Sequence, residues 1–387
     1  MKRFLLLPFT LLLAWACCNE TPRQQANPVD YVNILCGTLS KFELSTGNTY
    51  PAVAVPWGAH FWTPQTGKNG DGWTYRYDAT RIRGLKQTHQ PSPWINDYGA
   101  WSLMPVAGKP VYEEEQRSSW FSHKAEVATP YYYSVYLADY DITAELTPSA
   151  HAAALRVRYP KEDPAYLVVD AYKGGSASLQ DPNTIVGYSV QNHGGVTENF
   201  HNWFVIHSDT PFELCGGDDC TLLVALPAGA LVNLQAASSF ISPEQAVQNL
   251  QEVAVGFDAV KSAARELWND TLGRIEVQDD NLDHLRTFYS CLYRSLLFPR
   301  DLSELNAAGE RVHYSPHNGK VEKGYFYTDT GFWDTFRSLF PLLNLVYPEV
   351  SARVQEGPGA GRPGERLSGK RLPARVGQPG APRLHGG

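Results

Sequence analysis

The chain has 387 residues and a formal net charge of −7, and 12% of its residues are aromatic. This length allows two domains with a sizeable core. The negative charge, and the lack of a clustered basic stripe before residue 355, argue against a nucleic-acid-binding surface. Abundant Trp and Tyr are typical of β-structure and of sugar-binding surfaces, although ordinary β-cores are also rich in them.

Residues 1–18 have the pattern of an export signal. Lys2 and Arg3 precede an apolar run at residues 4–13, which is too short to span a membrane as a mature anchor. The following Ala-Trp-Ala fits cleavage by an ordinary signal peptidase, and Cys17 directly after it resembles the lipobox of bacterial lipoproteins. We therefore predict export to the bacterial periplasm or outer membrane, with a lipid on Cys17, or on its neighbour Cys18, as the only membrane contact.

Residues 28–240 are predicted to form strands and turns. Tyr133, Val135 and Leu137 alternate with other side chains, a second alternation runs from residue 155 to 159, and residues 165–171 form a short apolar run. Gly and Pro recur at short intervals between these segments. This pattern predicts a large antiparallel β-sandwich.

The four cysteines beyond the signal fall into two groups. Cys215 and Cys220 bracket a Gly-Gly-Asp-Asp turn, where hairpin neighbours lie near disulfide distance. An exported protein favours a disulfide, and two free thiols remain the alternative. The spacing, with no partnering His, makes zinc a poor interpretation. Cys36 and Cys291 lie among apolar residues and are expected to be small core side chains.

A helical linker is predicted at residues 241–280. Ser242 is a helix N-cap, followed by Pro243 in the first helical position and Gln245 three residues after the cap. The expected apolar stripe of this linker is Val247, Leu250, Ala254, Phe257, Val260, Ala264, Leu267 and Trp268, with a possible break at Gly256. Asp280 is expected to cap a further helix, with Leu285, Tyr289, Leu292 and Leu296 buried and its end before Pro299.

Residues 332–343, FWDTFRSLFPLL, are predicted to form a buried helix. It places Asp334 and Arg337 beside the aromatic ring of Trp333. A Trp face that packs on a sugar ring, with a carboxylate and a guanidinium for its hydroxyl groups, is typical of carbohydrate sites. The alternative is an ordinary core helix in which Asp334 and Arg337 pair with each other.

The loop at residues 88–99, THQPSPWINDYG, is a second candidate site. Trp94 is either a stacking platform for a sugar or a core Trp beneath a Pro-rich turn. His89 is either a ligand-binding side chain or a hydrogen-bonded structural histidine. Asp97 either contacts ligand or caps a turn.

Five stretches resemble glycoside hydrolase family 92 in the same order, and together they span nearly everything from residue 28 to 354. They are YVNILCGT, NTYPAVAVPWG, RIRGLKQTHQPSPWINDYGAWSLMP, FSHKAEVATPYYYSVYL and WDTFRSLFPLL. That family comprises calcium-dependent, inverting exo-α-mannosidases. The resemblance implies a galactose-mutarotase-like supersandwich at 28–240, the linker at 241–280, and the first helices of an incomplete (α/α)6 barrel at 281–354.

The resemblance also implies roles for the candidate residues. Asp334 matches the residue at the floor of the terminal-mannose pocket, with Trp333 and Arg337 beside it, and the loop with Trp94, His89 and Asp97 matches the subsite for the leaving sugar. The family's catalytic acid and base and its calcium ligands come from later helices, so none is expected in this chain. Three acids that match neither catalytic residue are expected to be solvated, and they are Asp301, Glu304 and Glu310.

The resulting functional prediction is half of an α-mannosidase that acts on mannose-containing glycans and is inactive on its own. A stand-alone carbohydrate-binding sandwich is the alternative. Residues 355–387 lack aromatics and are rich in Gly, Pro, Ala and Arg. They are either a disordered tail or an out-of-frame translation, because codons chosen for residues 372–387 can be shifted by one nucleotide to read LPEWASPG, which resembles the family's continuation.

Overall fold

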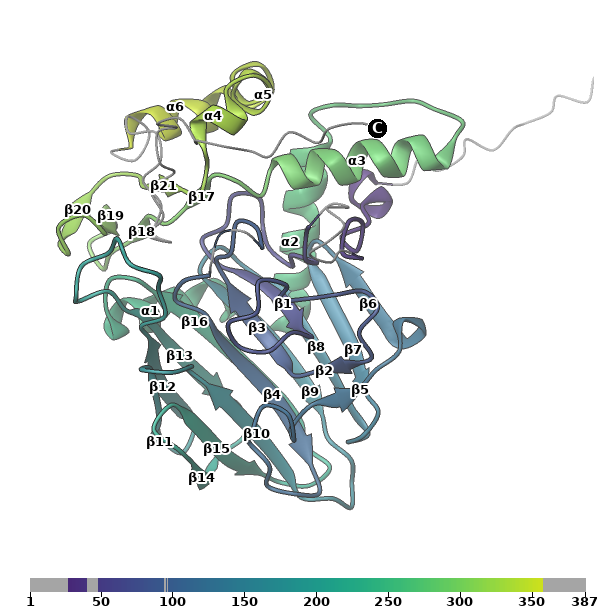
Figure 1. Cartoon of the computed structure of the whole chain (residues 1–387), viewed down its shortest axis with the longest axis vertical. Helices are drawn as coiled ribbons and strands as arrows, with labels where there is room; N and C mark the ends of the chain where they lie inside the picture. The colour runs from purple at the N-terminus through teal and green to yellow at the C-terminus, as the bar shows by residue number, and fades with distance from the viewer. Residues whose placement is uncertain (1–26, 40–47, 94, 96, 358–387) are drawn as a thin grey trace, which may run out of the picture.

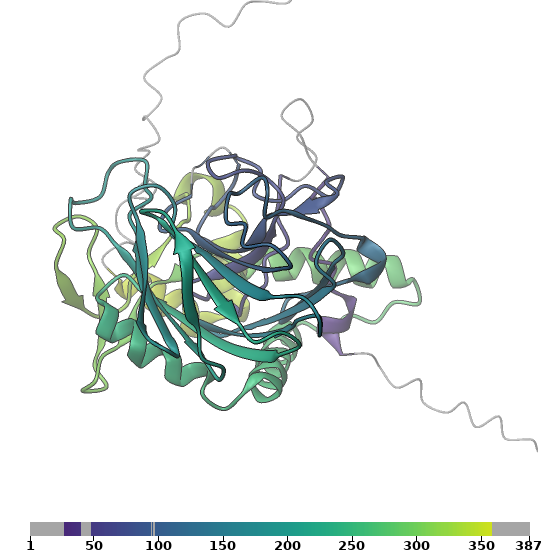
Figure 2. The ribbon, with the colours of Figure 1, turned by 90° about the horizontal axis from the view of Figure 1, so that it is seen from below.

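Two antiparallel sheets pack face to face and enclose the main core (Figures 1 and 2). The structure is a computed structural model that describes residues 27–39, 48–93, 95 and 97–357. The predicted export signal, Trp94 and the tail from residue 358 onwards lie outside the described residues. The predicted β-sandwich is confirmed.

The six-stranded sheet has the order β1-β3-β4-β10-β15-β14. Its strands are β1 (Phe61–Gln65), β3 (Gly84–Thr88), β4 (Trp101–Ala107), β10 (Ala165–Asp170), β15 (Thr221–Leu226) and β14 (Glu213–Gly217). Strand β10 pairs with β4 on one side and β15 on the other. Its central position explains why residues 165–169 are apolar, whereas Asp170 at its end is buried in an ion pair with Arg117.

The eight-stranded sheet has the order β11-β12-β13-β16-β9-β8-β7-β6. Its strands are β11 (Ser176–Asp181), β12 (Thr184–Ser189), β13 (Asn202–Ser208), β16 (Leu231–Ser239), β9 (Ala152–Arg158), β8 (Ile142–Pro148), β7 (Tyr132–Leu137) and β6 (Glu126–Thr129). The alternating residues Tyr133, Val135 and Leu137 of β7 all point into the core, as the period of two predicts. Short elements complete the sandwich and its loops: η1 (Pro28–Tyr31), β2 (Arg81–Ile82), β5 (Ser119–Trp120) and η2 (His123–Ala125).

Helices of the linker cover part of the outer face of the eight-stranded sheet. They are α1 (Pro243–Asn249), η3 (Leu250–Val253) and α2 (Phe257–Leu272). Small residues on the strands, including Ala152, Ala154 and Ala237, let Phe257 and Val260 pack closely against the sheet. The Ser242 cap is confirmed, since its side chain accepts a hydrogen bond from the Gln245 N–H. The break at Gly256 is also confirmed, with φ of 92° immediately before α2.

The buried face of α1 differs from the predicted one. Val247 is exposed, whereas Gln245 and Asn249 are buried. These amides bond across the interface, with Gln245 Nε2 donating to the Leu305 carbonyl at 2.8 Å and Asn249 Nδ2 to the Ser238 carbonyl at 2.9 Å. An apolar-period argument fails here because the helix faces backbone carbonyl groups that need donors. Leu267 of α2 is likewise exposed.

Helix α3 (Leu282–Ser295) buries the predicted stripe of Leu285, Tyr289 and Leu292. Asn281 caps it rather than Asp280, because the Asn281 side chain accepts the Asp283 N–H. Two cysteine predictions are wrong. Cys291 is exposed on α3, and Cys36 is exposed in a turn, so neither is a core residue.

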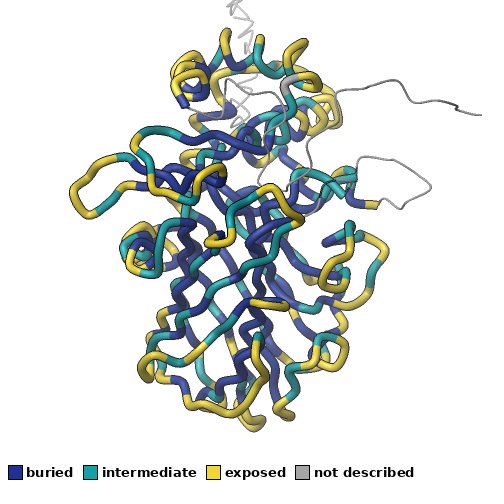
Figure 3. Tube along the Cα trace, turned by 60° about the vertical axis from the view of Figure 1, so that its left-hand side comes forward, coloured by how far each residue is buried: buried dark blue, intermediate teal, exposed yellow. Residues whose placement is uncertain are grey.

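The chain beyond α3 forms small strand pairs and three short helices at one end of the sandwich (Figure 1). The strands are β17 (Arg300–Asp301), β18 (Glu304–Leu305), β19 (Arg311–Tyr314), β20 (Val321–Lys323) and β21 (Tyr327–Thr328). The helices are α4 (Phe332–Thr335), α5 (Leu339–Val346) and α6 (Pro348–Glu356). Figure 3 shows that this end carries much exposed surface.

The single buried helix predicted at residues 332–343 is wrong in two respects. The stretch is divided into α4 and α5 by turns at residues 336–338. Pro341 lacks an N–H group, which suits the first turn of α5 but not the middle of a longer helix. Trp333 is also 68% exposed and Phe336 40% exposed, so little packs over α4. Among the described residues, no helix is long and apolar enough to cross a membrane.

Candidate functional site

Of the three residues predicted on the 332–343 stretch, Trp333 and Asp334 lie on α4 and Arg337 lies in the turn that follows it. Trp333 and Asp334 are exposed, and the Arg337 guanidinium carbon is 5.4 Å from the centroid of the Trp333 ring and 4.8 Å from that of Phe336. Arg337 therefore lies against two aromatic faces. The group combines an exposed aromatic ring, a carboxylate and a guanidinium, which is the chemistry that neutral sugars require.

The segment that leads into α4 is fixed by Asp329. Its backbone has φ of 65°, a left-handed conformation that is uncommon outside Gly, Asn and Asp. Its Oδ2 accepts the Tyr98 hydroxyl at 2.5 Å and lies 3.1 Å from Arg300 Nε. Burial, and then the Asp329 carboxylate, raise the pKa of Tyr98, so its hydroxyl remains a donor. The carboxylate thereby joins α4 to the sandwich loop at residue 98.

Arg300 is fully buried beneath this segment. Its guanidinium carbon lies 3.5 Å from the centroid of the Phe61 ring, and Nη1 donates to the Thr88 carbonyl at 3.3 Å. Nη2 donates to the Tyr50 hydroxyl at 3.3 Å. A buried guanidinium requires a counter-charge, and Asp329 supplies it.

His89 lies inside the sandwich and is held by hydrogen bonds at both nitrogens. Nδ1 is 2.6 Å from the Tyr98 carbonyl, which can only accept, so Nδ1 carries the proton. Nε2 then accepts from His60 Nδ1, also at 2.6 Å. Burial, and then the charge of Arg300, lower the pKa of His89 and keep it neutral. This is the structural alternative of the two that the sequence left open.

Asp97 also takes its structural alternative. Its carboxylate lies 2.8 Å from Lys86 Nζ and accepts the Thr88 hydroxyl at 2.6 Å. It further accepts the backbone N–H groups of His89 and Tyr98. The side chain is 4% exposed, so it organises the loop from within and is not presented to a ligand.

Arg300, Asp329 and Tyr98 were missed by sequence reasoning. The sequence did offer one signal for this site. Arg300 directly follows an apolar run, so it is expected to be buried and to need a partner of opposite charge. That partner could not be located, because Tyr98 and Asp329 are 231 residues apart in the chain.

One of the three acids expected to be solvated is buried. Glu304 is 2% exposed and accepts Asn249 Nδ2 at 2.6 Å and the Ser239 hydroxyl at 2.9 Å, and its burial raises its pKa. Glu304 is thus a hydrogen-bond partner of the polar face of α1, which the apolar periodicity of the sequence did not predict. Glu310 is exposed and pairs with Lys323 at 2.5 Å, as expected for a solvated acid. Asp301 is half-buried and accepts the Ser303 N–H at 3.0 Å.

Both thiols of the predicted Cys215–Cys220 pair are free. The strand register explains this, because Cys215 lies in a bulge between Leu214 and Gly216 and faces no partner in β15. Cys220 belongs to the turn, where its thiol lies 3.5 Å from Asp218 Oδ1. Of the two alternatives, the structure has free thiols.

No calcium ligand is assigned among the described residues. No group of three or more His, Cys, Asp or Glu side chains among them is placed to hold a metal ion. No chemical step of this chain is therefore assigned to calcium.

Family models and solved structures place the chain among glycosidases. A model for the glycosyl hydrolase family 92 N-terminal domain matches residues 31–222, and one for the family 92 catalytic domain matches residues 245–358. A family 92 inverting mannosidase from Bacteroides thetaiotaomicron is 45% identical, with a TM-score of 0.85 over 89% of this chain and 50% of that one. A family 92 α-mannosidase from the same organism, solved with mannoimidazole, is 25% identical, with a TM-score of 0.71 over 85% and 48%.

A curated relative from Arthroderma benhamiae is described as an uncharacterized secreted glycosidase. It is 21% identical over 77% of this chain and 45% of its own length. The chain thus spans about half the length of the relatives it matches. Because the two domain models of one family together match most of its residues, this chain belongs to glycosyl hydrolase family 92.

Proposed function

We propose that this chain is the sugar-holding half of an exported exo-α-mannosidase. The observation that carries the proposal is the surface of α4 and of the turn after it, where Trp333 and Asp334 are exposed and Arg337 lies over the Trp333 ring. The family membership and the mannosidase relatives support mannose as the sugar. The relative described as secreted supports export, and we further propose the periplasm or outer membrane, with Cys17 as the lipidated residue.

The three side chains have complementary roles in this proposal. Trp333 offers a ring face to the C–H surface of a terminal mannose, and the Asp334 carboxylate accepts two of its hydroxyl groups. Arg337, held against the rings, donates to a third polar atom. Charge-assisted hydrogen bonds of this kind contribute about 1.5–3 kcal/mol where water is excluded.

Hydrolysis is proposed only for a protein that also carries the second half of the family's length. Inversion requires two carboxyl groups on opposite faces of the sugar, one to protonate the leaving oxygen and one to activate water. Calcium, which the resemblance implies, would belong to that longer protein as well. The 387-residue chain is therefore expected to bind mannosides and not to release mannose from them.

Calorimetric titration of the full chain with mannobiose tests the proposal. We expect Asp334→Asn to weaken binding by about tenfold or more, because a charged acceptor is replaced by a neutral one. Asp283→Asn is the matched control, since Asp283 is exposed on α3. Equal affinities for the native chain and Asp334→Asn would contradict the assignment of α4, and release of free mannose would contradict the expected lack of turnover.

A stand-alone sugar-binding sandwich is the second candidate, and one observation favours it. Tyr188 of β12 pairs with Trp203 of β13, and His201 stacks on Trp203 with ring centroids 4.7 Å apart. These half-buried rings share one face of the eight-stranded sheet and could form a stacking platform. Loss of mannobiose binding in Trp203→Ala, with Trp333→Ala unaffected, would favour this candidate over the α4 surface.

A further inference from the structure

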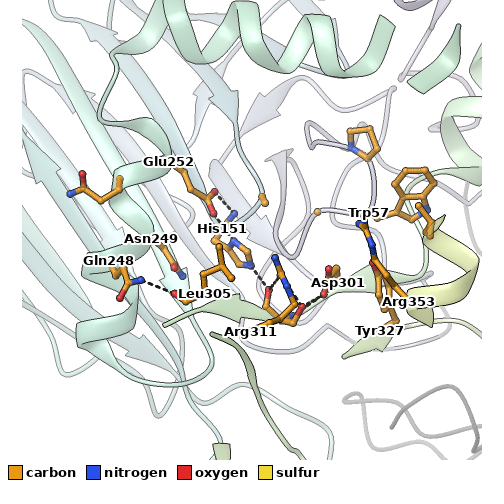
Figure 4. Close-up of a pocket in the computed structure, with 16 residues that line it drawn as sticks. Trp57, His151, Gln248, Asn249, Glu252, Asp301, Leu305, Arg311, Tyr327 and Arg353 are labelled. Carbon is orange, nitrogen blue, oxygen red and sulfur yellow. Dashed lines mark hydrogen bonds and ion pairs between the residues drawn. The ribbon is translucent and has the colours of Figure 1, made fainter. Parts of the chain in front are cut away.

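A cavity of about 490 Å³ lies between the sandwich, the linker and α6 (Figure 4). None of the residues assigned to mannose lines it. Its walls come from the loop at residues 56–58, the β8–β9 turn, η3, the strands β17 to β19, β21, and α6. This volume is in the range of small-molecule sites and accommodates a sugar.

One wall is formed by His151 and Glu252, whose charges balance each other. His151 Nε2 lies 3.1 Å from the Ser303 carbonyl and Nδ1 lies 2.7 Å from Glu252 Oε1. Both partners are acceptors, so both ring nitrogens donate and the ring is an imidazolium. The Glu252 carboxylate also accepts a hydrogen bond from the Ser149 hydroxyl at 2.7 Å, so it is hydrogen-bonded within the protein.

Two guanidinium groups, those of Arg311 and Arg353, also line the cavity. Arg311 Nη1 donates to the Ser303 hydroxyl at 3.2 Å, and the Arg311 and Arg353 guanidinium carbons lie 4.8 and 5.6 Å from the Tyr325 ring centroid. Arg353 also hydrogen-bonds the Tyr327 side chain. Neither a hydroxyl nor a ring supplies a negative charge to these cations.

The carboxylates next to Arg311 and Arg353 in the chain form ion pairs with other cations. Glu310, which precedes Arg311, pairs with Lys323 at 2.5 Å. Glu349, one turn before Arg353 on α6, pairs with Arg274 at 2.6 Å. Asp301 lines the cavity together with the two arginines. The charge of Glu349 also acts on Arg353, but its carboxylate is hydrogen-bonded to Arg274, so the two guanidinium groups keep N–H donors for a ligand.

Trp57 also lines the cavity. Its φ is 53°, a left-handed conformation that is a strained outlier for a bulky side chain. Its carbonyl accepts the Asp301 N–H at 2.9 Å, which ties the strained residue to β17. The ring contacts Tyr347 edge-on, with centroids 5.3 Å apart, which leaves an indole surface on the lining.

We propose that this cavity binds an anionic sugar, with its carboxylate or phosphate on Arg311 and Arg353 and its ring against Trp57. Guanidinium groups recognise both oxyanions through paired N–H donors, so the two anions share one chemistry. Asp301 and Tyr327 accept from sugar hydroxyl groups. The proposal concerns a separate site from α4, so it stands or falls independently of mannose binding there.

Calorimetry on the full chain tests this at low and at physiological salt. The probes are glucuronate, mannose 6-phosphate, mannose and inorganic phosphate. We expect the two sugar acids to bind at least about tenfold more tightly than mannose, and the affinity to fall as salt rises. Binding of mannose at equal strength would overturn the proposal. Equal binding of inorganic phosphate and mannose 6-phosphate would show an adventitious ion only and would overturn the role of the sugar.

Variants locate the site. Arg311→Gln and Arg353→Gln should each weaken sugar-acid binding by about tenfold, and Arg353→Lys should retain part of it because the charge remains. Arg286→Gln, on the exposed surface of α3, is the matched control. Arg353 is exposed on α6, so its substitution leaves the core intact, and thermal melting verifies this. Unchanged affinity in both Gln variants would overturn the assignment of the cavity.

Discussion

Asp329 is the residue whose charge the buried site depends on most. Replacing it with Asn keeps the shape of the side chain and tolerates φ of 65°, so the change removes the negative charge and exchanges one acceptor oxygen for an NH2 group. Arg300 would then be left as an uncompensated buried cation. We expect Asp329→Asn to lower the free energy of unfolding by about 3–5 kcal/mol.

Urea denaturation of the full chain provides the measurement for Asp329→Asn. The control is Asp283→Asn, which removes the exposed Asp283–Arg286 pair and should cost about 0–1 kcal/mol. A native-like midpoint for Asp329→Asn would mean that Arg300 does not require this counter-charge.

Histidine residues give the stability a predictable dependence on pH. Burial lowers the pKa of His151, but the Glu252 carboxylate outweighs it and raises the pKa from 6.5 to about 9. The stabilisation from protonated His151 is complete below pH 6.5 and is lost as the pH rises through about 9. Burial lowers the pKa of His60 and His89, so protonation favours the unfolded chain as the pH falls below 6.5.

Stability is therefore expected to be greatest near pH 6.5, with an acid limb from His60 and His89 and an alkaline limb from His151. Urea midpoints measured across this range should show both limbs in the native chain. His151→Gln should remove the alkaline limb and keep the acid one. An alkaline limb that survives in His151→Gln would contradict the role of this pair.

At the scale of elements, the cap of α1 is a local feature with a measurable contribution. The Ser242 hydroxyl oxygen accepts the Gln245 N–H at 3.2 Å. Ser242→Ala leaves that donor without its cap, and we expect a loss of about 1 kcal/mol in urea denaturation. Ser178→Ala, at an exposed position of β11, is the control and should change little. A loss no larger than the control's would show that the cap is replaced by solvent.

Elements with local signals could be predicted from the sequence, and elements fixed by distant partners could not. Strand alternation at residues 133–137, the Ser242 cap and the Gly256 break each depend on neighbours in the chain, and all three are confirmed. The buried face of α1 was misassigned because the amide side chains of α1 donate hydrogen bonds to a carbonyl group and to a carboxylate from other segments. Residues on α4 were found, but their exposure and the Asp329 anchor depend on contacts that no local pattern contains.

At the scale of the whole molecule, exposed apolar side chains are unevenly distributed between the sandwich and the helical end. The sandwich buries most of its apolar residues between two sheets, whereas α3, α4, the turn after α4 and α5 expose Leu282, Trp333, Phe336 and Leu345. Leu345 is 74% exposed and Leu282 54% exposed. Exposed apolar side chains of this size favour association or partner binding where they form a patch. The helical end should therefore determine how the 387-residue chain behaves in solution.

We expect the full chain to associate with rising concentration and to bind a hydrophobic dye through this end. Leu345→Gln should reduce both effects, because it removes the most exposed apolar side chain of α5. Leu214→Gln is the matched control, since Leu214 is 68% exposed on β14, a strand of the sandwich. Sedimentation velocity measures association, and dye fluorescence reports accessible apolar surface. A native chain that stays monomeric at every concentration and binds no dye would contradict this prediction. Equal responses of the two variants would show that the helical end is not the surface through which the chain associates.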